Sequence, residues 1–247
     1  MTTFATRRPS HPTERWKRHP SLIDSGVEWL GQVPATWQTK KIKHICLVRR
    51  GASPRPIDDP VYFDDEGDYA WVRISDVTAS SKYLVSTEQR LSALGQSKSV
   101  RLQPGDLFLS IAGTVGKPII TKIKCCIHDG FVYFVNLKQD REFLFYLFTS
   151  GELYKGLGKH GTQLNLNTDT IGEIRIPVPP IPEQAQIASF LDRETAKIDA
   201  LTGGIQLPGN GPERGKLWEF YALLHEYRTA LISAVVTGKI DVREEVE

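Results

Sequence analysis

The stretch from Gly161 to Leu201 constrains the fold of this chain more than any other. It reads GTQLNLNTDTIGEIRIPVPPIPEQAQIASFLDRETAKIDAL, in which a strand-like segment is followed by a proline-rich break and then by an amphipathic helix. Pro182 suits the first helical turn because its missing N–H would have no partner there. The order of these segments predicts that a β-rich domain ends near residue 180 and is joined directly to a helix.

Short apolar segments upstream of that junction predict a sheet-based domain. β-branched and aromatic residues alternate there with turn residues, which is typical of strands. One helix is expected over 141–157, where apolar residues recur at intervals of three and four. The predicted fold class is therefore mixed α/β (α+β), with a β-rich domain followed by two helices. The segments expected to form strands are 40–48, 69–77, 105–113, 118–123, 130–137 and 172–178.

Two stretches after residue 181 each place apolar residues on one helical stripe. The second, from Lys216 to Thr237, has the alternating steps of a heptad seam, and Gly238 follows it where a left-handed residue ends a helix. Two helices cannot bury such a seam alone. It packs either within one chain or against a second copy or a partner subunit, and both interpretations stay open. The residues expected at this interface are Ile187, Leu191, Ile198, Leu201, Leu217, Phe220, Leu224, Tyr227 and Leu231.

The segment between the two helices, 202–215, has the sequence TGGIQLPGNGPERG. Its five glycines and two prolines prevent a helix from continuing, so we expect a loop. The chain then divides into a flexible basic arm at 1–20, a β-rich domain at 21–180 and a helical spacer or dimerisation region at 181–247.

Basic residues are concentrated at the start of the chain. Up to residue 56 there are eleven lysines and arginines and only three acidic residues, although the whole chain has a formal net charge of +2. Such an excess favours contact with phosphates, because each neutralised phosphate releases condensed counterions. A solvated, charged tail is the alternative interpretation.

Several protein classes are disfavoured by the sequence. No apolar run is long enough to span a membrane, and the N-terminus lacks the apolar centre of a secretory signal, so a cytoplasmic location is expected. The three cysteines have no metal-site spacing and are expected to be reduced thiols. GLGKHG at 156–161 matches G-x-G-x-x-G but follows a helix, which is the reverse of a dinucleotide site. We expect no metal, no cofactor and no catalytic activity in this chain.

The chain also resembles the DNA-specificity subunit of Type I restriction-modification systems. The resemblance begins with DSGVEWLGQVPATWQTKKIKHI and continues in order through RRGASPRP, YAWVRISDV, LQPGDLFLSIAGTVGKPII, the 161–201 stretch and EYRTALISAVVTGKIDVR. It therefore covers about 21 to 243. It implies that residues 21–180 form a target recognition domain, and that the helices hold partner subunits.

Members of that family are non-catalytic readers of a split DNA site. The resemblance implies double-stranded DNA, methyltransferase (M) subunits and restriction (R) subunits as partners, with S-adenosylmethionine, ATP and Mg²⁺ bound by those partners. Typical members have two recognition domains in one chain, whereas this sequence has one. It resembles a half-length form, which implies a homodimer whose two copies read two half-sites. The interrupted spacer at 202–215 is a further departure from the family, which usually has an unbroken helix there.

Side chains that reach DNA are expected on loops between strands, because a rigid scaffold presents them there. Arginine and lysine match phosphates, and polar side chains match base edges. The candidates are Arg49, Arg50 and Arg55 in RRGASPRP, Thr114 and Lys117 in GTVGKP, and Lys159, His160, Thr162, Gln163 and Asn165 in KHGTQLN.

Two other functions remain open from the sequence. The chain could be a recognition fragment of a fused DNA methyltransferase, or a decayed or regulatory protein that binds the partner subunits without reading DNA. Transfer of a methyl group by the isolated chain would favour the first. Subunit binding without DNA selectivity would favour the second.

Overall fold

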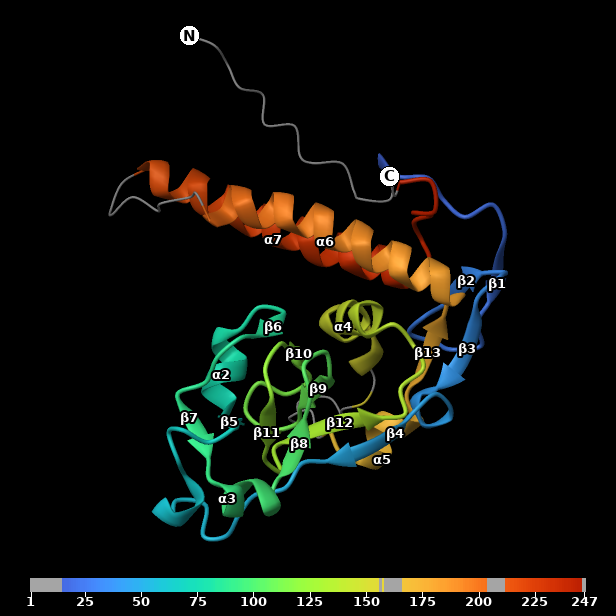
Figure 1. Cartoon of the computed structure of the whole chain (residues 1–247). Coiled ribbons are helices and arrows are strands. Elements are labelled where there is room, and N and C mark those ends of the chain that lie inside the picture. The colour runs from blue at the N-terminus through green and yellow to red at the C-terminus, as the bar shows by residue number, and fades with distance from the viewer. Residues whose placement is uncertain (1–14, 156, 158–165, 204–211, 246–247) are drawn as a thin grey trace.

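A pair of long helices lies across a β-rich domain (Figure 1). The computed structural model describes residues 15–155, 157, 166–203 and 212–245. The helices are α6 (Ile181–Gly203) and α7 (Pro212–Val236), which run antiparallel and pack along each other. We call this pair the rod. The predicted fold class, a mixed domain followed by two helices, is confirmed.

Two sheets form the body of the domain. One has five strands in the order β4-β12-β9-β10-β6, and the other has four in the order β7-β5-β11-β8. Both are mixed, because β6 runs parallel to β10 and β5 runs parallel to β11. The strands are β4 (Leu47–Arg50), β5 (Tyr69–Val72), β6 (Tyr83–Leu84), β7 (Gln89–Leu91), β8 (Val100–Leu102), β9 (Leu107–Ser110), β10 (Pro118–Thr121), β11 (Cys125–Ile127) and β12 (Phe131–Val135).

Successive side chains of the central strand β9 point to opposite faces of the larger sheet and so belong to two different apolar clusters. Leu107 and Leu109 belong to a cluster that includes α4 and the rod, whereas Phe108 joins the cluster between the two sheets. Phe108 meets Phe131 edge-to-face at 5.4 Å between ring centres. The domain is therefore layered, with the helices on one face of the larger sheet and the smaller sheet on the other.

Short elements connect and close these layers. The helix α4 packs against β10, α6 and α7, so it lies between the larger sheet and the rod. The pairing of β3 with β13 brings the start of the domain beside its end, directly before α6. The remaining elements are β1 (Leu22–Asp24), β2 (Gln32–Pro34), β3 (Gln38–Lys41), η1 (Ile42–His44), η2 (Pro60–Tyr62), α2 (Ile74–Ala79), α3 (Ala93–Ser97), α4 (Arg141–Thr149), η3 (Glu152–Tyr154), α5 (Thr168–Glu173) and β13 (Arg175–Val178).

Five of the six segments expected to be strands contain one, although several strands are shorter than predicted. The prediction for 40–48 was wrong at its centre: β3 ends at Lys41, η1 follows, and β4 begins only at Leu47, because the N–H groups of Ile45 and Cys46 donate to the Ile42 carbonyl. The segment 69–77 is a strand only to Val72, because Asp76 accepts a hydrogen bond from the Arg73 backbone N–H and starts a helix. The helix expected over 141–157 ends at Thr149, since Gly151 has a left-handed φ of 69°.

The expected basic arm at 1–20 is corrected for its last six residues. The Trp16 ring meets Phe190 of α6 edge-to-face at 4.9 Å, and His19 is only 7% exposed. Residues 15–20 thus include a part of the interface with the rod, formed by the rings of Trp16 and His19. The sequence did not indicate this, because both rings stand among polar and basic residues. Residues 1–14 lie outside the described ranges.

The residues expected at the helical interface have two different environments. Ile187, Leu191, Ile198 and Leu231 are buried against the domain and the other helix. In contrast, Leu201 is 56% exposed and Phe220 is 48% exposed, toward the far end of the rod. Packing within one chain therefore accounts for the near half of the seam only. Leu217, Leu224 and Tyr227 are half-buried.

Gly238 ends the last helix, as its position in the sequence predicts. Its φ is 73°, and a Cβ atom there would lie 2.3 Å from Pro34 Cδ. The loop expected at 202–215 is corrected at its two ends, because helix structure extends over Thr202, Gly203 and 212–215; residues 204–211 lie outside the described ranges. Among the described helices, none combines the length and apolar character needed to cross a membrane.

Candidate nucleic-acid interface

Loops from both sheets converge at one end of the domain. β4 and β9 run in the same direction within the larger sheet, and β5 and β11 do so within the smaller one. The backbone N–H of Ala52, just after β4, donates to the Ile127 carbonyl at the end of β11, and Ile111 N–H donates to the Gly130 carbonyl. We call the resulting surface the loop face; it consists of residues 50–55, 73–78, 111–117 and 128–130.

Asp129 organises the two arginines of the loop face that the sequence predicted. Its backbone carbonyl accepts from Arg50 Nε at 2.5 Å, and its carboxylate is 3.0 Å from Arg55 Nη2. Ser53 Oγ donates to the same carboxylate at 2.8 Å. The Ser53 hydrogen bond, followed by the positive charge of Arg55, lowers the pKa of Asp129. Each guanidinium has further N–H donors that these contacts leave available.

Thr78 of α2 holds the other two predicted residues of this surface. Lys117 Nζ donates to the Thr78 carbonyl at 3.0 Å, and the hydroxyls of Thr114 and Thr78 are 2.9 Å apart. Burial lowers the pKa of Lys117. The loop is pressed closely onto α2, since a Cβ atom at Gly113 would lie 2.7 Å from Ile74 Cγ2. Thr114 and Lys117 are therefore presented in one fixed arrangement.

Arg49 does not join this group. It alternates with Arg50 along β4 and so points to the opposite face of the strand, in register with Tyr133. Its side chain is exposed there. The sequence motif RRGASPRP thus contributes Arg50 and Arg55 to the loop face, whereas Arg49 lies on the other face of β4.

The five candidates of the KHGTQLN segment lie outside the described residues. The chain that precedes them is nevertheless anchored beside the loop face, because the Tyr154 hydroxyl donates to the Gly116 carbonyl at 3.0 Å. The described chain resumes at Leu166, which is 2% exposed. These candidates are Lys159, His160, Thr162, Gln163 and Asn165.

Two residues of the loop face were missed in the sequence. Arg73 is exposed directly after β5, and its Nε donates to Gln89 Oε1 at 2.7 Å. His128 follows β11; its Nδ1 accepts from the Gly130 N–H at 2.9 Å, and its ring centre is 4.4 Å from that of Phe131. Burial lowers the pKa of His128. The sequence offered no signal for either residue, because Arg73 lies inside the segment expected to be a strand and β11 was not predicted.

A second group of basic side chains lies away from the loop face, with Lys122 and Lys124 between β10 and β11 and Arg101 in the middle of β8. Lys122 Nζ is 4.0 Å from the centre of the Tyr83 ring, and the Arg101 guanidinium is 5.5 Å from that of Tyr69. Lys124 is also exposed. These cations lie over aromatic rings and lack the backbone and carboxylate contacts that fix the arginines of the loop face.

The described residues contain no group of three or more histidine, cysteine or acidic side chains that could hold a metal ion. Cys46, Cys125 and Cys126 are buried free thiols. Burial raises the pKa of Cys46 and Cys125 to about 12 and that of Cys126 to about 11. These three thiols are therefore not reactive thiolates at neutral pH.

Residues 34–207 match the family model described as "Type I restriction modification DNA specificity domain". The Type I restriction enzyme MjaIX specificity subunit of Methanocaldococcus jannaschii is 29% identical over 171 residues, which cover 66% of this chain and 38% of that protein. A putative Type I specificity subunit of Haemophilus influenzae is 26% identical over 47% of this chain and 30% of its own length.

Two solved structures share the fold. One, from work on complex assembly and conformational transition of the Type I system, has a TM-score of 0.58 at 20% identity and covers 92% of this chain. The HsdS subunit of Thermoanaerobacter tengcongensis has a TM-score of 0.53 at 17% identity and covers 89%. This chain spans about half the length of each of them. The match over most of its residues shows that the chain belongs to the family of Type I restriction-modification DNA specificity domains.

Proposed function

We propose that this chain is a non-catalytic module that reads one half of a bipartite duplex DNA target with its loop face. The observation that carries the proposal is the convergence of Arg50, Arg55, Arg73 and Lys117 at the ends of strands from two sheets. Cations placed in this way suit the evenly spaced phosphates of a duplex. The family to which the chain belongs is one of DNA-recognition components.

The loop face has the two kinds of contact that sequence-specific recognition requires. Phosphate contacts fix the orientation of a protein on the duplex, whereas contacts to base edges carry the specificity. Arg50 and Arg55 are positioned by Asp129, and their free donors suit phosphates or the acceptors of guanine. Thr114 adds a hydroxyl. Lys159, His160, Thr162, Gln163 and Asn165 remain candidates for base contacts.

The far end of the rod supports the pairing of two copies. Leu201, Trp218 and Phe220 are each between 46% and 56% exposed, although large apolar side chains are usually buried in a monomer. A homodimer would cover these side chains and place two loop faces on one duplex, as a half-length reader requires. We also propose that the rod carries the M and R subunits, which would bind S-adenosylmethionine, ATP and Mg²⁺.

A docking protein that does not read DNA is the second candidate function. The same exposed side chains of the rod favour it, because they do not depend on the loop face. The two candidates differ in one property, which is the selectivity of duplex binding. A methyltransferase fragment remains the third possibility, and its test is methyl transfer from S-adenosylmethionine by the isolated chain.

Matched charge variants test the leading proposal. Arg73→Gln/Lys117→Gln removes two charges from the loop face, and Lys122→Gln/Lys124→Gln removes two from the opposite ends of the strands. We expect the first pair to weaken duplex binding about tenfold and to lower the salt dependence by about one phosphate contact per residue. The control pair should retain nearly wild-type binding, measured by fluorescence anisotropy across a salt series.

The starting material for this test is a duplex selected from a random-sequence pool by the wild-type chain, alone and with its M subunit. Failure to select any sequence in either condition would contradict DNA reading. Equal losses in the two double variants would move the interface away from the loop face.

A further inference from the structure

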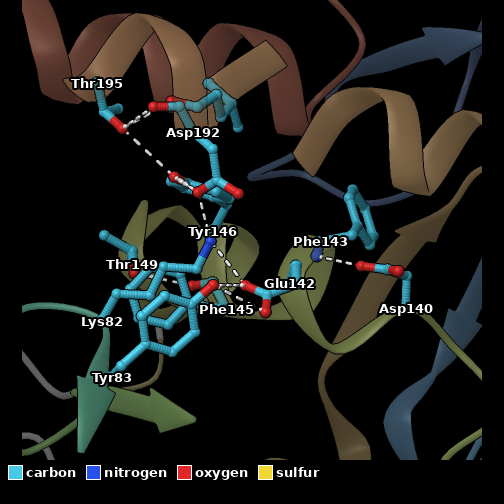
Figure 2. Close-up of polar contacts among 11 residues, drawn as sticks. Lys82, Tyr83, Asp140, Glu142, Phe143, Phe145, Tyr146, Thr149, Asp192 and Thr195 are labelled. Atoms are coloured by element: carbon cyan, nitrogen blue, oxygen red, sulfur yellow. Dashed lines mark hydrogen bonds and ion pairs between the residues drawn. The ribbon is translucent and has the colours of Figure 1, made fainter. Parts of the chain in front are cut away.

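A partly buried cluster of polar side chains joins the domain to the rod (Figure 2). Lys82 lies at its centre, between α2 and the edge strand β6, with a side chain only 12% exposed. Its Nζ contacts Glu142 Oε2 of α4 at 2.6 Å and also pairs with Asp192 of α6. One cation thus binds two carboxylates from two different helices.

Hydroxyl groups complete the cluster. The Tyr146 hydroxyl donates to Asp192 at 2.5 Å and lies 3.3 Å from Thr195 Oγ1 of α6. The Tyr83 hydroxyl donates to Glu142 at 3.0 Å. Burial by itself would lower the pKa of Lys82, but the hydrogen bonds to Asp192 and Glu142 outweigh it and raise the pKa. Lys82 therefore remains a cation.

The apolar part of the same interface cannot fix its geometry alone. Phe145, Phe190 and Leu191 belong to one continuous core between α4 and the rod. Hydrophobic contact is non-directional, so it favours burial without selecting one angle between the helices and the sheet. Hydrogen bonds depend on distance and angle, and a buried cation with a missing partner is costly. The Lys82 cluster therefore contributes to the selection of one orientation, together with the hydrogen bonds from Trp37 to Glu183 and from the Asp140 N–H to Gln184.

The segment that carries Lys82 also holds the loop face. Residues 73–84, which we call the connecting segment, begin at Arg73 and contain Thr78, the partner of Thr114 and Lys117. Only three residues separate Thr78 from Lys82. The Lys82 carbonyl also accepts from the Ile120 N–H of β10, the strand that follows the 111–117 loop. The loop face and the rod are thus held by opposite ends of one short segment.

We propose that Lys82 is a positioning residue for DNA recognition: its contacts with Glu142 and Asp192 fix the orientation of the loop face relative to the rod. This inference rests on the proposed function and extends it. In a pair of chains joined through their rods, that orientation sets the distance between the two half-sites. Lys82 would then determine the spacing of the target without touching DNA.

Distance measurements test the structural part directly. Ala112 of the loop face and Ala196 of α6 are exposed and can be replaced by cysteine for spin labelling, because the native thiols are buried. Pulsed electron resonance then gives the distribution of distances between the two labels. An excess of unlabelled chain removes distances between copies.

The test variant is Lys82→Met/Glu142→Gln/Asp192→Asn, which removes the cation together with both carboxylates. Lys82→Met alone would leave the two partly exposed carboxylates of Glu142 and Asp192 close together without a cation, so their repulsion would be added to the loss of the lysine contacts. The control is Lys41→Met/Lys43→Met/Glu173→Gln. It also removes three charges that form two ion pairs, but its central residue is a carboxylate between two lysines and the whole group lies within the domain. Far-UV circular dichroism verifies that both triple variants are folded.

We expect the test variant to shift or broaden the distance distribution beyond the wild-type width, while the control keeps the wild-type distribution. A folded test variant with the wild-type distribution would overturn the proposal. In selections from a random duplex pool, the test variant should keep the half-site sequences and lose the preferred spacing. Retention of the wild-type spacing would also overturn it. If the wild-type chain selects no sequence, the proposed function fails, and the distances alone decide the role of Lys82.

Discussion

The near and far halves of the rod have the same apolar pattern and opposite environments. In the near half, Leu191 and Leu231 are fully buried against α4 and the domain. In the far half, the seam residues Leu201 and Phe220 and the neighbouring Trp218 are about half exposed, and Leu217 is half-buried. The rod extends past the domain at the end where α6 stops and α7 starts, so the domain covers only the near half (Figure 1). Heptad spacing therefore predicts a helix with an apolar stripe, whereas the position along the rod decides what covers the stripe.

The largest expected effect separates the two halves by stability. Leu191→Ala should lower the free energy of unfolding by about 2–5 kcal/mol, because it leaves a cavity in the core. Leu201→Ala should change it by less than about 0.5 kcal/mol, because the side chain is exposed. Chemical denaturation of the two variants measures both values. Similar losses in the two variants would show that the far half is also part of the folding core.

The next effect concerns association. Trp218→Ser/Phe220→Ser should weaken self-association of the chain by about 2 kcal/mol or more, because large aromatic side chains dominate most interfaces. The free energy of unfolding of the monomer should hardly change. Sedimentation velocity over a concentration series measures the association. Val85→Ser is the matched control, since Val85 is 66% exposed within the domain. A wild-type chain that stays monomeric throughout would refute the homodimer.

A smaller effect should follow acidification and should be confined to the near half. His19 packs edge-to-face against Trp37 and faces Glu183, Asp241 and Arg243. Burial lowers the pKa of His19 despite the two carboxylates.

His19 of the unfolded chain is protonated below about pH 6.5, whereas His19 of the folded chain is protonated only at lower pH. The free energy of unfolding therefore decreases as the pH falls below about 6.5. Hydrogen exchange at pH 7.5 and pH 5.5 should show faster opening at 15–24 and at the start of α6. The far half should be unaffected. His19→Gln should reduce this pH dependence, and an unchanged response would remove His19 as its cause.

The sequence predicted the parts of the fold that local pattern determines. The apolar segment within 105–113 indicated β9, the apolar residues at intervals of three and four indicated α4, and Gly238 marked the end of α7. The start of α2 was missed because it depends on the hydrogen bond from Arg73 to Asp76 rather than on periodicity. The short strands β8 and β11 were missed because only their pairing in the smaller sheet stabilises three residues as a strand.

The candidate site was predictable in composition but not in arrangement. Loop motifs pointed to Arg50, Arg55, Thr114 and Lys117, and the structure places all four on one face. Nothing in the sequence indicated that Asp129, more than 70 positions from Arg55, would fix that arginine. The Lys82 cluster was unpredictable for the same reason, because its members come from three distant segments. Long-range contacts of this kind arise from topology and leave no local pattern.

The contact between the two ends of the described chain also has a consequence for biosynthesis. The Asp241 N–H donates to the Lys17 carbonyl, and Lys17 pairs with Glu244, 227 positions away. Such a contact closes a loop of 227 positions, and it can form only after Glu244 has left the ribosome. Lys17 therefore lacks these two partners until residues 241–244, which follow α7, have emerged. The contact between the earliest and latest described residues is thus among the last of the described contacts that can form during synthesis.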